Sequence, residues 1–252
     1  MAKAAFISDI HSNLEALQVV LEDISRRGIE EIHCLGDIVG YGPNPEVCTD
    51  LILSKCRSFI RGNHDDALTH GPVGFNPVAR SAIEWTKDRM LPHLWKAGSR
   101  RRWRFLSELP LQANWEGFLL VHGSPRDPIS EYIMDRDILF GPPDMFPDIF
   151  SRFETVCLVG HTHIPGVFYD DPIFMPQRDL PGPVPLEGRK MIVNVGSVGQ
   201  PRDHDPRASY VSFEDGHFLF HRLEYDFRVT QGKIRAIEQL DPRLSERLSE
   251  GI

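Results

Sequence analysis

Five short clusters of metal-binding residue types occur in a fixed order along the chain, and four of the five directly follow an apolar, β-type run. Each cluster combines glycine or a turn residue with carboxylate, imidazole or amide groups. The clusters are Asp9-x-His11, Gly36-Asp37, Gly62-Asn63-His64-Asp65, His122-Gly123 and Gly160-His161-Thr162-His163. Oxygen and nitrogen ligands are therefore expected at several strand ends, which is the arrangement that a two-metal hydrolytic centre needs.

The first sixty residues predict a β-α-β-α-β unit with a largely parallel sheet. The predicted strands are residues 3–8, 31–35 and 57–60. The predicted helices begin near Leu14 and Pro45, where helical spacing and proline at a helix start are found. Asp9, Asp37 and Asn63 follow the three strands. Because parallel strands end at one edge of a sheet, we expect these three side chains to lie side by side.

The remainder of the chain predicts a helical segment followed by a β-rich half. Residues 76–106 are expected to be helical, and the arginine run from Arg100 to Arg104 is interpreted as a solvated face of that segment. The candidate strands after it are residues 111–115, 117–121, 155–159, 166–169, 191–195, 209–213 and 217–223. The last dozen residues are expected to form a loosely held helix or tail.

We expect two halves, about 1–115 and 116–252, each forming one sheet. Two sheets packed face to face with helices outside form a single α/β sandwich. The predicted organisation is therefore one domain over 1–252, with a helical insert at 76–106.

Composition and charge exclude several classes of protein. The apolar and charged fractions, 41% and 25%, are ordinary for a globular chain, and the net charge of −8 disfavours broad binding of nucleic acid. No apolar stretch predicts a signal peptide or a membrane span, so the cytoplasm is the expected location. The four cysteines have no CxxC spacing, and a disulfide framework is not expected. Oligomeric state is not predicted.

The residue types within the clusters suit particular roles. Asp9 and His11 alternate along an extended segment, so both can contact one cation. Asn63 can offer an amide oxygen, and His64 next to it is suited to act as a general acid beside the metals. Asp65 is interpreted as a helix cap or as a partner of the ligands.

Three further histidines follow strands in the second half, at His122, His161 and His163. The spacing of the last two repeats the i, i+2 arrangement of the first cluster. A mixed set of aspartate, histidine and asparagine without cysteine favours Mn²⁺, Fe or Zn²⁺ over Ca²⁺.

The five clusters together resemble those of the calcineurin-like metallophosphoesterase superfamily. The resemblance implies a four-layer α/β/β/α fold with two mixed sheets. It implies two metal ions, the first bound by Asp9, His11, Asp37 and His163, and the second by Asp37, Asn63, His122 and His161. Asp37 would bridge the two. A hydroxide between the metals would attack phosphorus, and His64 would assist the leaving group.

Departures from the superfamily pattern bear on the substrate. Protein Ser/Thr phosphatases of the superfamily carry GDxVDRG, whereas this chain has Gly40 and Tyr41 in place of its second Asp and its Arg, which disfavours a protein phosphatase. The segments GDIVGYGPNP, HGSPRDP and NVGSVGQPRD are similar to a bacterial branch of small phosphoesterases. That branch includes phosphodiesterases and enzymes similar to bis(5′-nucleosyl)-tetraphosphatases.

Arg126, Arg202 and Tyr41 are the candidate substrate-binding residues. Arginine matches phosphate oxygens in a bidentate manner. The alternatives are rim salt bridges of Arg126 and Arg202 with the aspartate that follows each of them. Tyr41 and Tyr132 could stack on a base or serve only in packing.

The leading hypothesis is a dinuclear metal-dependent phosphohydrolase acting on a small anionic phosphoester or phosphoanhydride, such as a dinucleoside polyphosphate. A phosphodiesterase or nuclease, and a non-catalytic scaffold with the same fold, are the alternatives.

Overall fold

Two six-stranded mixed sheets form the centre of the molecule. We describe it from a computed structural model that covers residues 3–93, 95–171, 173–186 and 188–252. The first sheet has the order β3 (Ser58–Phe59), β2 (Glu31–Cys34), β1 (Ala4–Ile7), β11 (Ala208–Glu214), β12 (His217–Leu223) and β9 (Val184–Pro185). The second has the order β4 (Gln112–Trp115), β5 (Phe118–Val121), β6 (Val156–Val159), β10 (Met191–Asn194), β7 (Gly166–Tyr169) and β8 (Ile173–Pro176).

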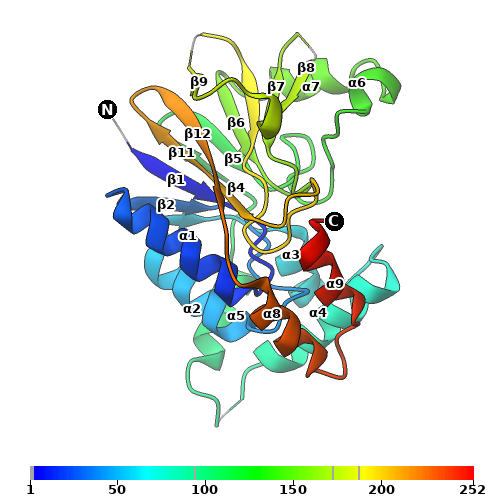
Figure 1. Ribbon diagram of the computed structural model, residues 1–252. Helices are drawn as coiled ribbons and strands as arrows, with labels where there is room; N and C mark the ends of the chain where they lie inside the picture. Colours follow the sequence, from blue (N-terminus) through cyan, green and yellow to red (C-terminus); the bar gives the residue numbers. More distant parts are fainter. Residues whose placement is uncertain (1–2, 94, 172, 187) are drawn as a thin grey trace.

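Helices cover the outer faces of both sheets (Figure 1). The helices are α1 (Leu14–Arg26), α2 (Pro45–Lys55), α3 (Asn63–His70), α4 (Pro77–Met90), α5 (Ser99–Ser107), α6 (Asp137–Phe140), α7 (Met145–Ser151), α8 (Phe227–Arg235) and α9 (Arg243–Glu250). A short 3₁₀ turn, Gln177–Asp179, follows β8. In the described part of the chain, no helix has the length and apolar character needed to cross a membrane.

The alternation of side chains along each strand creates the layers. In β1, Ala5 and Ile7 join an apolar cluster with α1 and α2, whereas Ala4 and Phe6 join a second cluster that lies between the sheets. On the far side, alternate residues of β6 and β10 pack against α7 in a third cluster. Three apolar interfaces separate four layers, so the predicted α/β/β/α sandwich with two mixed sheets is confirmed.

The expectation that each half of the chain builds one sheet is wrong. β11 and β12 come from the second half, yet β11 pairs antiparallel with β1 in the first sheet, with Ala4 opposite Phe213. β4 comes from the first half, yet it pairs with β5 in the second sheet. Strand patterns specify which face is buried but not which neighbour a strand edge will find. β8 and β9 were not predicted, and β9 lies in a proline-rich segment.

The expectation of a loosely held C-terminal tail is also wrong. α8 and α9 form a helical hairpin that packs against α4 and, through α8, against α1. Leu244 and Leu248 of α9 are buried in a fourth cluster together with Ala82 of α4 and Ile234 of α8. The hairpin is also joined to the loop after β1, because Thr230 donates a hydrogen bond to the Asn13 side chain at 3.0 Å.

Replacing Leu244 with alanine should lower the free energy of unfolding by about 2–5 kcal/mol, because it leaves a cavity among the buried leucines of the hairpin. Urea denaturation measures this change. The control is Val229→Ala on the exposed face of α8, which should change stability by no more than about 0.5 kcal/mol. Equal, small effects of both substitutions would show that α9 is not packed as described.

Candidate metal centre

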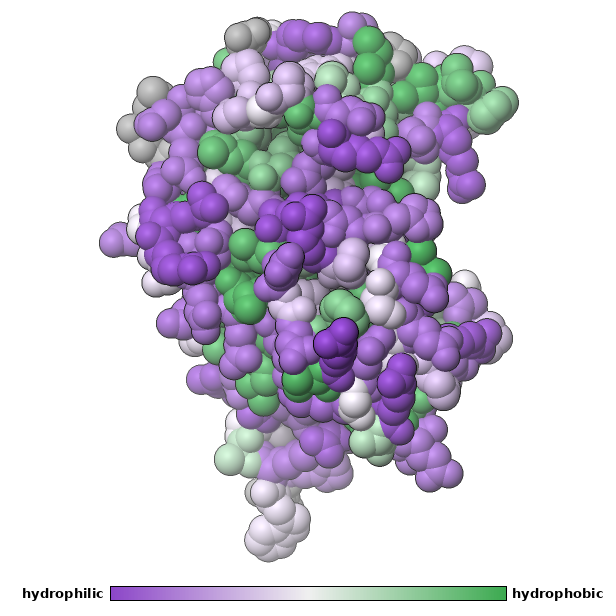
Figure 2. All heavy atoms as spheres, in the orientation of Figure 1, coloured by the Kyte–Doolittle hydropathy of each residue, from purple (hydrophilic) through white to green (hydrophobic). Residues whose placement is uncertain are grey.

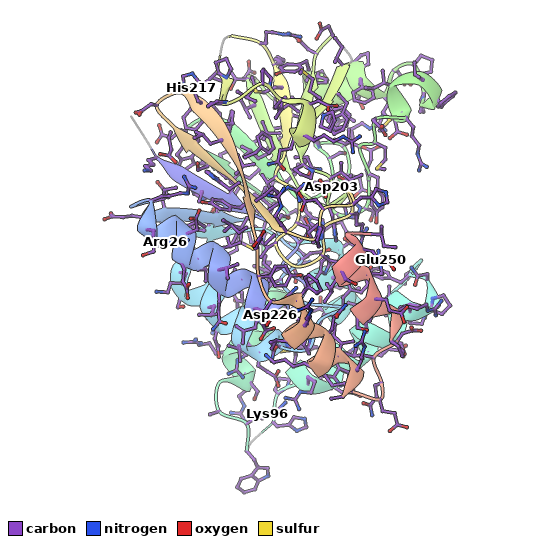
Figure 3. All side chains as sticks on the ribbon, viewed as in Figure 1. Arg26, Lys96, Asp203, His217, Asp226 and Glu250 are labelled. Carbon is purple, nitrogen blue, oxygen red and sulfur yellow. The ribbon has the colours of Figure 1, made fainter. Side chains whose placement is uncertain are left out.

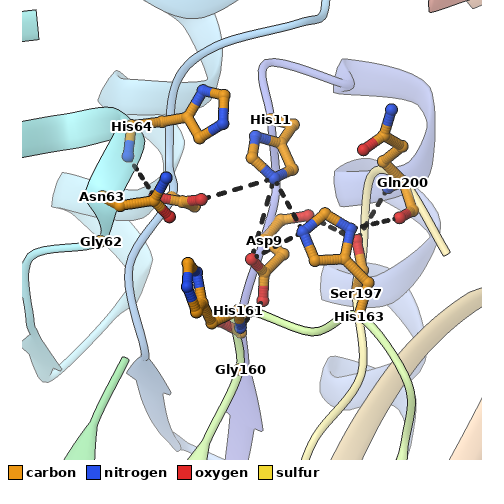
Figure 4. Close-up of polar contacts among 12 residues, drawn as sticks. Asp9, His11, Gly62, Asn63, His64, Gly160, His161, His163, Ser197 and Gln200 are labelled. Carbon is orange, nitrogen blue, oxygen red and sulfur yellow. Dashed lines mark hydrogen bonds and ion pairs between the residues drawn. The ribbon is translucent and has the colours of Figure 1, made fainter. Parts of the chain in front are cut away.

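Five loops from both sheets converge on one buried cluster, which Figure 4 shows in close-up. Much of its backbone lies in the left-handed region. The residues with positive φ are Asp9 (53°), His11 (46°), Asp37 (51°), His161 (64°) and His163 (63°). For a residue other than glycine this conformation costs roughly 1–2 kcal/mol. Strain of this kind persists where the surrounding structure enforces it, typically at functional sites.

Hydrogen bonds between the loops fix this backbone. The Asp9 and His11 amides donate to the carbonyls of Gly36 and Asp37 at 3.0 and 2.9 Å, which joins the first two loops. The His161 amide donates to Asp9 Oδ2 at 3.0 Å across the two sheets. Asp9 therefore positions a loop that is 152 residues away in the sequence.

Four of the predicted ligands lie together. Asp9, His11, Asp37 and His163 are all buried, and each offers an atom within 4.8 Å of the other three. These are the four residues that the resemblance assigns to the first metal. Their assignment as ligands remains a prediction, but the structure brings them to one point.

The hydrogen bonds of the imidazoles show that this point suits a cation. Nδ1 of His11 faces the Val39 carbonyl at 3.2 Å, and Nδ1 of His163 faces the Gln200 carbonyl. A carbonyl only accepts, so in both rings the proton is on Nδ1 and the lone pair is on Nε2. The two Nε2 atoms lie 3.2 Å apart, and Asp9 Oδ1 beside them is buried without a hydrogen-bond donor. A cation satisfies all three atoms.

Asp37 connects this group to the remaining candidates. Its Oδ2 atom lies 3.5 Å from His11 Nε2 and 3.5 Å from His122 Nε2. His122 Nε2 is also 3.2 Å from the amide oxygen of Asn63, and its Nδ1 faces the Leu35 carbonyl at 2.8 Å. The His161 ring lies 4.9 Å from the His122 ring, centroid to centroid. Asp37 thus occupies the shared position between two sets of side chains.

Burial and charge set the protonation states of the cluster. Burial lowers the pKa of His11 and of His163, which keeps both rings neutral and able to coordinate. Burial also acts to lower the pKa of His122, but the facing carboxylate of Asp37 outweighs it and raises the value to about 9. A cation bound between Asp37 and His122 would therefore displace a proton.

The N-terminus of α3 lies close to Asp37, and Gly62 before the helix makes this close approach possible. The His64 amide, in the first turn of α3, donates to Asp37 Oδ1 at 2.8 Å. A Cβ atom at Gly62 would overlap that same carboxylate oxygen. Asp65 accepts hydrogen bonds from the amides of Ile38 and Gly62, at 3.0 and 3.1 Å, so it supports the loop that carries Asp37.

His64 lines a cavity of about 300 Å³ above the cluster. Burial lowers its pKa to about 4. Its Nδ1 atom has no hydrogen-bond partner among the described residues, and a side chain at Gly40 would collide with that atom. Gly40 therefore lies directly against the His64 ring, but as a glycine it has no side chain that could form a hydrogen bond to the ring and orient it. The ring is held by packing against Tyr41 (4.4 Å) and Phe75 (5.0 Å).

The three predicted substrate-binding residues have different positions. Tyr41 and Arg202 both line the cavity. Arg126 does not: its guanidinium is paired with Glu131 and lies 3.8 Å from Asp148. The acid that pairs with Arg126 is therefore Glu131, not the adjacent aspartate. Binding of substrate by these residues remains a prediction for all three.

Several residues of the site were missed from the sequence. Phe75, Asn76 and Ser130 line the cavity. Tyr132, which the sequence had offered as a base-stacking or packing residue, also lines it and stacks on His161, with 3.8 Å between the ring centroids. The Ser197 hydroxyl donates a hydrogen bond to the Asp9 carbonyl at 2.8 Å. In the sequence, the one sign that Ser197 contacts Asp9 is its position after a glycine in the segment NVGSVGQPRD.

Comparisons with known proteins agree with this geometry. The sequence model of the calcineurin-like phosphoesterase superfamily domain matches residues 2–215. The protein therefore belongs to this superfamily and is a metal-dependent phosphoesterase. The buried group of Asp9, His11, Asp37 and His163 is one that could hold a metal ion.

Relatives of known sequence or structure extend the comparison. The chain is 40% identical to the uncharacterized protein MJ0912 of Methanocaldococcus jannaschii, over 98% of this chain and 97% of that protein. A crystal structure of a metallophosphoesterase from Sphaerobacter thermophilus is 38% identical, with a TM-score of 0.82 and coverage of 100% and 99%. Phosphodiesterase YfcE of Escherichia coli is 25% identical over 66% of this chain and 71% of its own.

Gly62→Ala should weaken Mn²⁺ binding by about 10–100-fold, because the new methyl group displaces the Asp37 carboxylate. Titration calorimetry with Mn²⁺ measures the affinity. Gly232→Ala in α8 is the control, since a Cβ atom there meets nothing within 4 Å, and it should bind Mn²⁺ as the wild type does. Unchanged affinity in Gly62→Ala would contradict the role of Asp37.

Proposed function

We propose that the protein hydrolyses a small phosphodiester or phosphoanhydride at a centre of two metal ions. The observation that carries this proposal is the position of Asp37 Oδ2, which lies 3.5 Å from both His11 and His122. One carboxylate oxygen with an imidazole nitrogen on each side suits a ligand shared by two cations. Asp9 and His163 would complete one set, and Asn63 and His161 the other.

The chain supplies a donor set that fits Mn²⁺, Fe or Zn²⁺, because it mixes carboxylate, imidazole and amide groups without thiolate. Such ions, when bound, polarise the phosphoryl group and make water a stronger nucleophile. The protein itself fixes the rings by the carbonyls behind them and keeps bulk water out by burial. In the overall reaction water adds across one P–O bond, the phosphoryl part gains a hydroxyl group and the leaving oxygen gains a proton.

His64 is proposed as the group that delivers this proton. Its ring lines the cavity 4.7 Å from the His11 ring. It is neutral in the protein alone, because burial lowers its pKa to about 4. A bound phosphate anion next to the ring favours the imidazolium form, which can then protonate the departing oxygen.

A small ester fits the cavity better than a phosphoprotein or a polynucleotide does. The volume of about 300 Å³ suits one or two phosphoryl groups with a compact substituent. Arg202 offers positive charge at its wall, whereas the whole chain carries a net charge of −8 that disfavours polyanions such as DNA. YfcE, named as a phosphodiesterase, is consistent with an ester of this kind. A dinucleoside polyphosphate is the phosphoanhydride candidate, and the undamaged ligand set disfavours a non-catalytic scaffold.

Metal removal provides the first test. The Mn²⁺-loaded protein should hydrolyse p-nitrophenyl phosphate, its bis ester or diadenosine tetraphosphate, and a chelator should abolish this activity until Mn²⁺ is restored. Asp37→Ala should lower kcat/KM by at least a factor of about 10³ because the shared ligand is lost. Activity that survives both treatments would refute the proposal.

His64→Ala should lower kcat by about 10²–10⁴ for an ester with a poor leaving group such as phenol. The loss should be much smaller for p-nitrophenol, which leaves readily without a proton. His70→Ala, an exposed histidine of the same helix, is the control and should retain activity on both esters. An equal loss on both esters would show that His64 does not protonate the leaving group.

A further inference from the structure

We propose that a second, larger cavity next to the metal centre binds the heteroaromatic base of a nucleotide substrate, while the phosphoryl group occupies the cavity at His64. This inference rests on the proposed function and adds the substrate class to it. Of the residues in the five sequence clusters, Thr162 alone lines this second cavity. Thr162 lies between His161 and His163 in the chain.

The second cavity has the size and the surface that a nucleobase requires. Its volume is about 580 Å³, within the range of small-molecule sites. The apolar walls come from the segment before α6, from α6 itself and from the strands β7 and β8. The apolar residues include Ile133, Ile138, Phe168, Ile173 and Phe174, together with Ile164 in the loop before β7. A flat aromatic base between such walls would have both of its faces buried against apolar side chains.

Arg202 connects the two cavities, because its side chain lines both. It donates a hydrogen bond to Gln200 Oε1 at 2.9 Å, and its Nε atom is buried with no partner among the described residues. Within the described part of the chain it forms no ion pair with a carboxylate. An unneutralised guanidinium at this junction suits a phosphate that joins a group in one cavity to a group in the other.

The polar atoms of the second cavity favour a base over an acyl chain. Asp203, which also lines it, pairs with Arg222 through Oδ2, and its Oδ1 atom is buried without a hydrogen-bond donor in the described chain. Figure 3 shows Asp203 near the centre of the molecule, between the sheets and α9. A base can donate an N–H group to this oxygen. An acyl chain would leave it unsatisfied, which is costly.

Apolar side chains are exposed at the mouth of the cavity. Leu139 of α6 and Ile173 of β8 line it and are 79% and 51% exposed. In Figure 2, hydrophobic residues gather at the upper right of the molecule, over the region of α6 in Figure 1. The cavity is therefore open to a ligand from solvent.

The experiment compares two esters with the same leaving group. The compact one is methyl p-nitrophenyl phosphate, and the extended one is the p-nitrophenyl ester of adenosine 5′-monophosphate. The wild-type Mn²⁺ enzyme should favour the extended ester by tenfold or more in kcat/KM. Ile173→Trp, which fills the mouth of the cavity, should remove most of that preference. Val229→Trp, a similarly exposed site on α8 that lines neither cavity, should keep the preference.

Each outcome bears on one of the two proposals. If the enzyme turns over both esters equally and Ile173→Trp has no effect, the base-binding cavity is refuted and the hydrolase stands. If a dodecyl p-nitrophenyl phosphate is preferred to the adenosine ester, an acyl chain is the occupant and the inference is wrong. If no ester is hydrolysed, calorimetric titration of adenosine 5′-monophosphate decides: weaker binding to Ile173→Trp than to Val229→Trp supports the cavity, and no difference overturns it.

Discussion

The structure depends on the burial of two carboxylates, Asp9 and Asp37, within one cluster. Two like charges removed from water are unfavourable unless hydrogen bonds and opposite charge compensate. Amides from distant loops supply part of the compensation, at Asp9 Oδ2 and Asp37 Oδ1. Imidazoles face the other oxygens. The carboxylate of Asp37 raises the pKa of His122 and holds it in the protonated form, whereas burial lowers the pKa of His11 and of His163 and keeps them neutral. The left-handed backbone of the loops is the conformational cost of this arrangement.

The sequence predicted the layers well but the pairing of the strands poorly. Runs of apolar, β-type residues identified β6, β10, β11 and β12, and β6 is apolar throughout because both of its faces are buried. The pairing of β1 with β11 could not be predicted from such patterns. Any strand with one face suited to the space between the sheets could have paired with that edge of β1. Leu244 and Leu248 of α9 and Leu240 just before the helix have helical spacing, but the apolar periodicity was interpreted as ending near Leu240.

The candidate site likewise has features that could be predicted from the sequence and features that could not. Ligand residue types recur in recognisable short motifs, so Asp37 and His163 could be selected from the sequence. The carbonyls of Val39, Leu35 and Gln200, which fix the imidazole tautomers, have no residue signature and appear only once the chain is folded. Arg126 shows the opposite case: its place in a motif predicted a position at the site, whereas its guanidinium pairs with Glu131 and does not line the cavity at His64. The second cavity was not predicted because its walls come from segments that share no pattern.

The pairing of β1 with β11 has a consequence for synthesis of the protein. Asp9, the first of the candidate ligands, follows a strand that has only one of its two partners until residues near 213 are available. A chain emerging from the ribosome can form β1, β2 and α1 early, but it cannot complete the edge that supports Asp9 before most of its length has been made. Such a long sequence separation slows folding through loop-closure entropy. Assembly of the loops that carry the candidate ligands is therefore expected only after the C-terminal strands have been made.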